Sequence, residues 1–194
     1  MSDPGVLRPG SLLVATASLA DPNFERSVVL VLDHDEDGSL GVVLNRPSPV
    51  PVSEVLPGWD DVLSGPDVVF QGGPVATDSA LAVAGLRVVA AGLGEDEEPV
   101  GFRRLFGHTG IVDLDTPAEI LTPALSRMRV FAGYAGWGSG QLAAEVEEGS
   151  WYVLPSEPSD LFADTPERLW SRVLRRQPGE LAWVSTAPLD PTMN

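Results

Sequence analysis

The residues most suggestive of a binding function form a glycine-rich segment, Gly133-Tyr134-Ala135-Gly136-Trp137-Gly138-Ser139-Gly140-Gln141. Glycine gives the backbone access to positive φ angles and lets another group approach closely. An apolar run precedes the segment and a short helical pattern follows it. Backbone N–H groups at the start of that helix could bind an anion. The alternative interpretation is that the glycines only allow a corner of the fold to pack.

Part of this segment also fits a dinucleotide-binding motif. Residues 138–143, with the sequence GSGQLA, match the pattern G-x-G-x-x-G/A. That motif requires a crossover helix between parallel strands, whereas the helical pattern here stops before Gly149. No second strand–helix–strand unit follows. We therefore expect no Rossmann site, and the sequence predicts no cofactor.

Carboxylates at alternate positions suggest a second kind of site. Asp33, Asp35 and Asp37, followed by Gly38, match the first half of a calcium-binding loop. The EF-hand also needs a bidentate glutamate further along, where this chain has Leu44, and both flanks are predicted to be strands. An acidic hairpin tip is therefore favoured, with a calcium site at the three aspartates as the alternative.

Residues able to do covalent chemistry are few. The chain has no cysteine, and all 12 of its basic residues are arginine. Thiol chemistry, cysteine metal sites, Schiff bases and a P-loop lysine are therefore excluded. The two histidines, His34 and His108, form no spaced motif, and no G-x-S-x-G elbow is present. A Ser-His-Asp triad stays open in principle, but the sequence predicts no catalytic residue.

Charge and hydropathy limit the classes of partner. The formal net charge is −16, and a field of this sign opposes binding to phosphate backbones. Direct nucleic-acid binding is therefore disfavoured. No apolar run reaches the roughly 18 residues of a membrane span, and the N-terminus lacks a signal-peptide pattern. We expect a cytoplasmic protein, and the abundance of Arg, Ala, Gly and Pro suggests a bacterium with GC-rich DNA.

The elements that would position these residues are short. Strands are predicted at residues 11–17, 27–32, 40–44, 68–71, 81–84, 87–91, 110–114, 127–132, 151–154 and 181–184. Asp37-Gly38 predicts a hairpin, and Asn45-Arg46-Pro47 should end the third strand because proline cannot continue a ladder. Short helices lie between the strands without strict alternation, which indicates an α+β fold. The length suits one domain, 1–186, followed by a tail, 187–194.

One helix is strongly amphipathic. It is predicted to begin at Thr165-Pro166 and to end near Gln177. Its apolar face carries Leu169, Trp170, Val173 and Leu174, and its other face carries Arg168, Arg172, Arg175 and Arg176. A docking or nucleic-acid-binding helix is one interpretation. A surface helix whose arginines suit the negative end of the helix dipole is the favoured one.

Several segments, in order along the chain, carry a family resemblance. They are Gly10-Ser11-Leu12-Leu13-Val14-Ala15, Asp21-Pro22-Asn23-Phe24-Glu25-Arg26-Ser27, Gly41-Val42-Val43-Leu44-Asn45-Arg46-Pro47, Gly72-Gly73-Pro74-Val75, Gly133-Tyr134-Ala135-Gly136-Trp137 and Gly149-Ser150-Trp151. With these segments the chain resembles the AlgH/YqgE-like family of uncharacterised bacterial proteins. The resemblance implies an α+β fold with a branched, mostly antiparallel sheet and a small barrel-like core surrounded by short helices. It implies no reaction, and one family name is linked to transcriptional regulation.

The matching segments suggest one candidate site. Polar and turn-forming groups at strand ends could gather with the glycine-rich segment in a cleft. The candidate ligand-binding residues are Arg26, Asn45, Arg46, Gly73, Tyr134, Trp137, Gly138, Gly140 and Gln141. In the alternative interpretation the arginines only pin loops by binding carbonyl groups. We expect a non-enzymatic binding or regulatory protein that acts through a protein partner or a small ligand. The alternative is an enzyme or sensor for a small anionic metabolite bound at residues 136–141.

Overall fold

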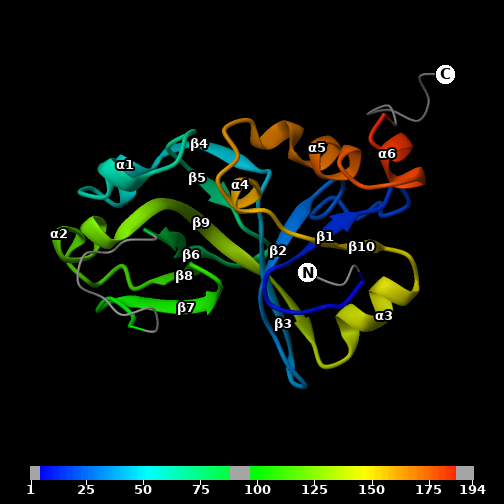
Figure 1. The fold of residues 1–194 in the computed structure, drawn as a ribbon, viewed down its shortest axis with the longest axis horizontal. Coiled ribbons are helices and arrows are strands. Elements are labelled where there is room, and N and C mark those ends of the chain that lie inside the picture. The colour runs from blue at the N-terminus through cyan, green and yellow to red at the C-terminus, as the bar shows by residue number, and fades with distance from the viewer. Residues whose placement is uncertain (1–4, 88–96, 187–194) are drawn as a thin grey trace.

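A long strand, β9 (Leu125–Gly138), connects the two halves of the molecule. The structure is a computed structural model and describes residues 5–87 and 97–186 (Figure 1). The other strands are β1 (Ser11–Ala15), β2 (Val28–His34), β3 (Gly38–Val43), β4 (Pro47–Pro51), β5 (Val68–Gln71), β6 (Val75–Leu86), β7 (Phe102–Phe106), β8 (Thr109–Val112) and β10 (Trp151–Pro155). The α-helices are α1 (Val52–Val55), α2 (Ala118–Leu121), α3 (Gln141–Glu147), α4 (Pro158–Leu161), α5 (Leu169–Arg175) and α6 (Glu180–Val184).

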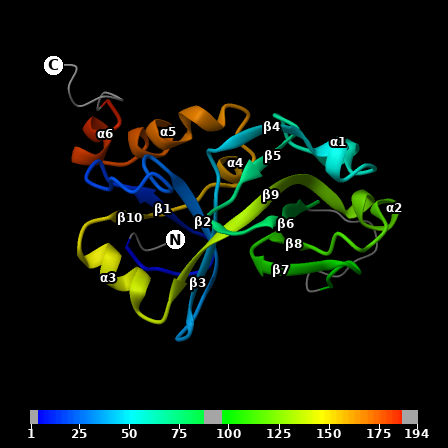
Figure 2. The ribbon, with the colours of Figure 1, turned by 180° about the vertical axis from the view of Figure 1, so that it is seen from behind.

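The sheet is branched at β9. Its main path runs β10-β1-β2-β3-β9-β6-β8-β7, and β4 and β5 leave this path through a parallel pairing of β5 with β9. The other strand pairs are antiparallel. Both views show the sheet curling, with β9 crossing from one half to the other (Figures 1 and 2). The predicted α+β fold with a branched, mostly antiparallel sheet is therefore confirmed.

The hairpin of β2 and β3 follows the predicted turn. One carboxylate oxygen of Asp35 accepts the backbone N–H groups of Asp37 and Gly38, at 2.8 and 3.2 Å. Side chains that hydrogen-bond the backbone two residues on stabilise tight turns. Beyond the sheet, this hairpin projects from the body of the molecule (Figure 1).

Three sequence predictions of secondary structure need correction. Residues 181–184 form α6 and not a strand, since Leu181 and Val184 lie three positions apart and both pack on the main core. Pro47 follows the end of the third strand, as predicted, but it also begins β4. Prolines are tolerated there because β4 is an edge strand that pairs only with β5. The glycine-rich segment was interpreted as a turn, yet most of it extends β9.

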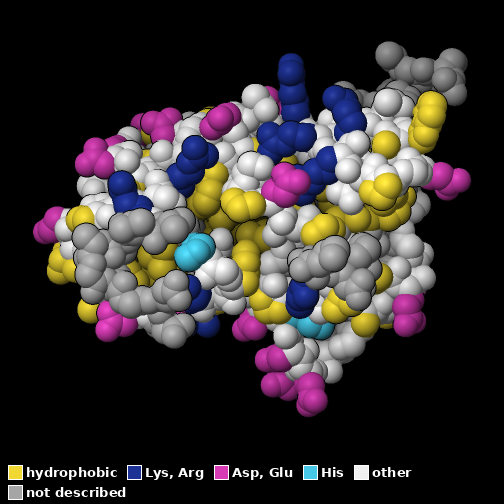
Figure 3. Space-filling model, viewed as in Figure 1, with side chains coloured by type: hydrophobic (Ala, Val, Ile, Leu, Met, Phe, Trp, Pro, Cys, Tyr) yellow, Lys and Arg dark blue, Asp and Glu magenta, His cyan; other side chains and the backbone are white. Residues whose placement is uncertain are grey.

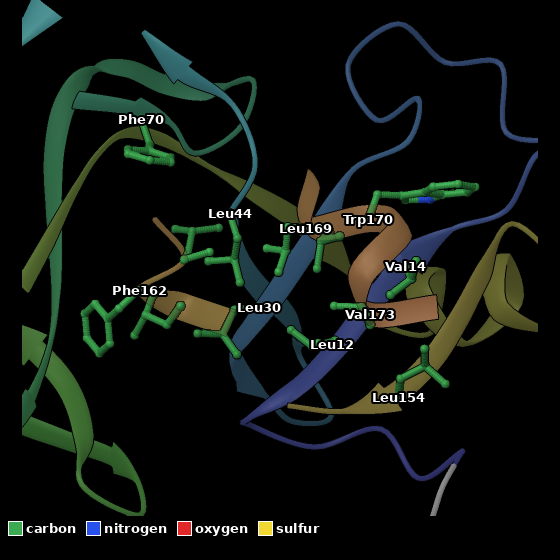
Figure 4. Close-up of a cluster of buried hydrophobic side chains, with 14 of the residues drawn as sticks. Leu12, Val14, Leu30, Leu44, Phe70, Leu154, Phe162, Leu169, Trp170 and Val173 are labelled. Carbon is green, nitrogen blue, oxygen red and sulfur yellow. The ribbon is translucent and has the colours of Figure 1, made fainter. Parts of the chain in front are cut away.

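The main hydrophobic core lies between the sheet and α5. Helix α5 buries Leu169, Trp170, Val173 and Leu174. In Figure 4, Leu169 and Val173 point toward side chains of β1 and β2 that include Leu12 and Leu30. A preceding 3₁₀ turn, Pro166–Arg168, starts the predicted helix. The apolar stripe read from the sequence therefore packs on the sheet, and the arginines of the opposite face remain outside.

The described helices are short, and none of them has the length and apolar character needed to cross a membrane. The strand predicted at 87–91 and the tail predicted at 187–194 fall mostly or wholly outside the described residues. Within those residues one continuous sheet joins both halves. This arrangement is compatible with a single domain over 1–186, which stays a prediction because residues 1–4 and 88–96 lie outside the described part of the chain.

Candidate functional site

The turn after β9 is filled by its own neighbours. The Gly138 N–H donates to the side-chain oxygen of Gln141 at 3.0 Å, and the Ser139 hydroxyl donates to the carbonyl of Glu36 at 2.7 Å. Gly140 adopts a left-handed conformation, with φ of 70°, and precedes α3. The turn thus fastens the β2–β3 hairpin to the start of α3. This geometry favours the packing interpretation of the glycine-rich segment.

A carboxylate next to this turn organises an aromatic cluster. One oxygen of Glu145 accepts the indole N–H groups of both Trp137 and Trp151, each at 2.9 Å. Its other oxygen accepts the amide N–H of Gln141 at 3.0 Å. Phe24 packs on both indoles, with ring centroids 6.0 and 5.5 Å away. Trp137 and Gln141 therefore support the fold around Glu145.

Arg26 and Asn45 connect the ends of neighbouring strands. The Asn45 side chain accepts the Val28 N–H and donates to the Arg26 carbonyl, both at 2.9 Å. The Arg26 guanidinium lies 4.7 Å from the centre of the Trp170 ring, a distance typical of cation–π contacts. Both residues thus contribute to the loop that leads into β2.

The Arg46 side chain pins the same loop. Its guanidinium donates to the carbonyls of Pro22 and Glu25, at 3.2 and 3.1 Å. Burial lowers the pKa of Arg46, and the negative charges of Glu25 and Asp21 oppose that shift. The alternative stated above, that an arginine binds carbonyls to fix a loop, describes these contacts.

Arg46 also reaches a groove of about 560 Å³ between β4, β5 and the irregular part of β6. Gly73 lies in the same groove. A Cβ atom added at Gly73 would lie 2.2 Å from the carbonyl carbon of Tyr134, so the glycine is needed for close approach to β9. Of the nine predicted residues, Arg46 and Gly73 line this groove. Ligand binding by them stays a prediction.

The nine predicted residues thus do not gather in one cleft. Arg26 and Asn45 lie at the start of β2, Arg46 and Gly73 line the groove, and the residues from Trp137 to Gln141 surround α3. Tyr134 lies in a separate small pocket beside Asp33. One cleft was suggested because several of these groups follow strand ends, but the strands concerned belong to different parts of the branched sheet.

The acidic hairpin shows no metal geometry. Asp33 accepts the N–H of His34 at 3.0 Å, and Asp35 is occupied by the turn. Across residues 5–87 and 97–186, no group of three or more His, Asp or Glu side chains is placed to hold a metal ion. The Asp35 carboxylate therefore supports the hairpin turn, and the choice between an acidic tip and a calcium site stays a prediction.

One histidine and one serine are hydrogen-bonded on this hairpin. The His34 Nδ1 atom lies 2.8 Å from the Ser39 hydroxyl oxygen, and the two residues are cross-strand partners. A catalytic serine needs its histidine oriented by a third group, yet the neighbouring Asp33 carboxylate bonds to backbone instead. This pair therefore fits a cross-strand contact better than a nucleophile.

A hollow larger than the groove beside Arg46 lies between the two halves of the molecule. This cleft has a volume of about 870 Å³. It is lined by parts of the segments 5–11, 85–86, 106–109, 126–127 and 153–162, together with Leu30. Figure 3 shows apolar side chains in the hollow between the halves. Its buried apolar residues are Leu30, Leu86, Val153, Leu154, Leu161 and Phe162.

The rim of this cleft carries more positive than negative groups. Arg8 and Arg127 line it, against the single carboxylate of Glu157, and the imidazole of His108 is part of the same lining. That carboxylate already lies 3.4 Å from the Arg176 guanidinium and caps α4. Within the described part of the chain, the Arg8 and Arg127 side chains have no hydrogen bond or ion pair. Two unpaired cations thus face the cleft of an acidic protein.

A buried arginine fixes the wall behind the cleft. Arg129 is 1% exposed, and its guanidinium donates to the carbonyls of Leu161, Gly65 and Ala163 at 2.8, 2.8 and 3.2 Å. Burial lowers the pKa of Arg129 to about 10, so the side chain stays charged at neutral pH. Its guanidinium also lies 4.2 Å from the centre of the Phe70 ring. Arg129 therefore ties the segment after α4 to β9.

Comparison with known proteins identifies the family. The AlgH-like family profile matches residues 12–182. The chain belongs to the AlgH-like family. A UPF0301 protein of Streptomyces avermitilis is 60% identical over 185 residues, covering 95% of this chain and 94% of the relative. A UPF0301 protein of Thermobifida fusca is 52% identical, with 95% and 94% of the two chains covered.

Two solved structures share the fold. Protein DIP2367 from Corynebacterium diphtheriae has a TM-score of 0.85 and 34% identity, covering 96% of this chain and 95% of its own. The AlgH protein from Pseudomonas aeruginosa has a TM-score of 0.65 and 28% identity, with 97% of each chain covered. The family resemblance read from the sequence is thus confirmed.

Sequence reasoning missed the cleft between the halves. Arg8 and Arg127 lie far apart in the chain and belong to no motif, and His108 was noted only as an isolated histidine. The local signal was the charged residue Arg127 near the start of the apolar run that becomes β9. The site depends on how β9 curls, and no short segment of sequence encodes that.

Proposed function

We propose that this protein binds, without transforming it, a small molecule that has an apolar body and an anionic group. The observation that carries the proposal is the cleft between the halves, with its apolar floor and with Arg8 and Arg127, whose side chains have no hydrogen bond or ion pair among the described residues. A regulatory role in the bacterial cytoplasm, exerted through the bound molecule, is part of the same proposal.

The size and lining of the cleft support a small ligand. Ligand pockets commonly enclose about 300–1,000 Å³ and combine apolar walls with a few polar groups, and this cleft encloses about 870 Å³. Each buried apolar contact removes ligand surface from water, at about 25 cal/mol per Å². An acyl or aromatic body therefore suits the floor better than a sugar or a free nucleotide.

The rim supports an anionic group on that body. Arginine presents several N–H donors that match the two oxygens of a carboxylate or phosphate. The Glu157 carboxylate lies 3.4 Å from the Arg176 guanidinium, which it shares with Asp160, so its negative charge is partly offset. The formal net charge of −16 opposes the approach of anions to most of the protein surface. The arginines that line the cleft would therefore favour anionic ligands at this site over other parts of the surface.

The lining favours binding over catalysis. The Ser126 hydroxyl donates to the Gly85 carbonyl at 2.9 Å and so is engaged in the fold. The hydrogen-bonded His34–Ser39 pair lies on the β2–β3 hairpin and does not line the cleft. The alternative, an anionic metabolite bound at residues 136–141, is less favoured because the Gly138 N–H already donates a hydrogen bond to the Gln141 side chain.

A thermal-shift series tests the proposal. Linear alkyl carboxylates of increasing length are compared with the matching alcohols, on wild type, on Arg8→Ala/Arg127→Ala, and on the control Arg103→Ala. Arg103 is exposed and lies outside the cleft. Saturating ligand at about 100 times its Kd should stabilise the native state by about 2.7 kcal/mol.

We expect the longer carboxylates to raise Tm in wild type and control, and the double variant to lose that rise. Alcohols should stabilise less than carboxylates of equal length. Equal shifts in all three proteins, or no shift with any chain length, would contradict a ligand site in this cleft.

A further inference from the structure

A second surface combines exposed arginines with an exposed tryptophan. It consists of the outward side chains of Arg168, Arg172, Arg175 and Trp183, and we call it the Arg/Trp face. Arg172 and Arg175 lie on α5, Arg168 lies on the 3₁₀ turn before it, and Trp183 lies on α6, which packs against α5. In Figure 3, arginine side chains gather along the edge formed by α4 and α5. This face lies away from the floor of the cleft.

The arginines of this face are little used by the fold. Arg176, at the end of α5, binds the buried Asp160 carboxylate through two hydrogen bonds of 2.7 and 2.6 Å. Arg172 makes only a long bond of 3.3 Å to the Ser159 carbonyl and lies 3.9 Å from Asp160. Among the described residues, the Arg168 and Arg175 side chains have no hydrogen bond or ion pair. Their positive charge is therefore available to a partner.

Trp183 is the unusual member of the face. It is 80% exposed, whereas the other four tryptophans of the chain are all buried, at 6% or less. Its helix α6 is fixed from the opposite side, where Leu181 and Val184 pack on the main core. A tryptophan can bury about 150–250 Å² of surface in a contact. An ordered helix that presents such a side chain to water is a preformed anchor for a partner.

We propose that the Arg/Trp face docks a protein segment that carries several carboxylates around an apolar anchor. Charge complementarity supports this occupant, since carboxylates pair with arginine through two parallel hydrogen bonds. Tryptophan and arginine are also the residues that most often dominate the energy of protein interfaces. The apolar anchor covers Trp183, and the carboxylates meet Arg172 and Arg175.

A nucleic acid fits this face less well. Duplex DNA carries one charge per about 1.7 Å of its axis, so its binding needs a long positive track. Here acidic residues flank the arginines, with Asp164 and Glu167 before α5 and Glu180 at the start of α6. A short acidic segment can contact the arginines alone. A longer phosphate backbone would also approach these carboxylates, which would repel it.

The tryptophan provides a direct readout of docking. The probe is a short synthetic amphipathic peptide with one glutamate face and one leucine face, and without aromatic residues. A lysine version of the same peptide is the charge control. Since the other tryptophans are buried, acrylamide quenching reports chiefly on Trp183. Docking should shift the emission to shorter wavelength and reduce the quenching.

Matched single variants separate this face from general electrostatics. Arg175→Glu and Arg103→Glu make the same change of charge at exposed positions, the first inside the face and the second outside it. Isothermal titration calorimetry compares the variants, because Trp183→Ser removes the fluorescent reporter. We expect Arg175→Glu and Trp183→Ser each to weaken binding of the acidic peptide about tenfold, a loss of about 1.4 kcal/mol. Arg103→Glu should change its Kd much less. Circular dichroism should be unchanged, because both side chains are exposed.

Three results would overturn the inference. The first is equal affinity of wild type, Arg175→Glu and Trp183→Ser for the acidic peptide. The second is a failure of that peptide to bind, or binding of an oligonucleotide in its place through the same residues. The third is wild-type self-association that Trp183→Ser abolishes, which would make a second copy of this chain the occupant.

Discussion

Replacing Glu145 by alanine should be among the most costly changes outside the main core. Its carboxylate accepts three side-chain hydrogen bonds, two of them from the indoles of Trp137 and Trp151. Hydrogen bonds to charged groups contribute about 1.5–3 kcal/mol each, and a buried donor left unpaired costs about 1–3 kcal/mol. Gln141 is exposed and can turn to water, so we count only the two indoles. The expected loss is about 3 kcal/mol, or roughly 6–12 °C in Tm for a chain of this size.

Urea denaturation followed by circular dichroism measures this loss. Glu147→Ala is the matched control, because Glu147 is an exposed glutamate on the same helix and should change stability by less than about 0.5 kcal/mol. Glu145→Gln keeps an acceptor oxygen and should recover part of the difference. If Glu145→Ala were as stable as Glu147→Ala, the carboxylate would not organise the aromatic cluster, and our account of the glycine-rich segment would be wrong.

Other substitutions test the remaining contacts. Arg129→Met should lower the free energy of unfolding by about 3–5 kcal/mol in urea, because buried carbonyls lose a charged donor; a variant as stable as wild type would refute the clamp. Arg46→Ala should cost about 1 kcal/mol, since its bonds to carbonyls are partly solvated, and a thermal scan showing no loss would free this arginine for a ligand role. Asp160→Asn should cost about 3 kcal/mol by removing the buried negative charge that binds Arg176 through two hydrogen bonds, with faster proteolysis near α4; an unchanged cleavage rate would contradict the pair.

Much of the fold follows from local sequence. The apolar runs that become β1, β2 and β5 were predicted within a few residues, since alternation and turn residues specify strands directly. The Asp37-Gly38 pair correctly predicted the turn of the β2–β3 hairpin. The prediction at 181–184 was wrong because a run of four apolar residues fits a strand or a helix equally well. Only contact of Leu181 and Val184 with the core decides between them.

The binding surfaces could not be predicted in the same way. The glycine-rich segment attracted attention because its residue types are rare in combination, yet their purpose is to receive Glu145 and the acidic hairpin. The cleft draws its lining from segments between residues 5 and 162. Such a site depends on the curvature of the sheet, for which a single sequence holds no local pattern. The arginines of α5 were identified, but the isolated exposure of Trp183 was not.

The short helix α4 connects the cleft with α5. Pro158, Ser159 and Leu161 line the cleft, while Asp160 turns inward and receives the Arg176 guanidinium from α5. A molecule that moves this helix from within the cleft must therefore also strain or relax the anchor of α5. Thermodynamic linkage then makes the effect reciprocal: whatever factor the cleft ligand imposes on peptide affinity, the peptide imposes on the ligand. If the cleft and the Arg/Trp face bind as proposed, these four residues would couple a small ligand to a protein partner.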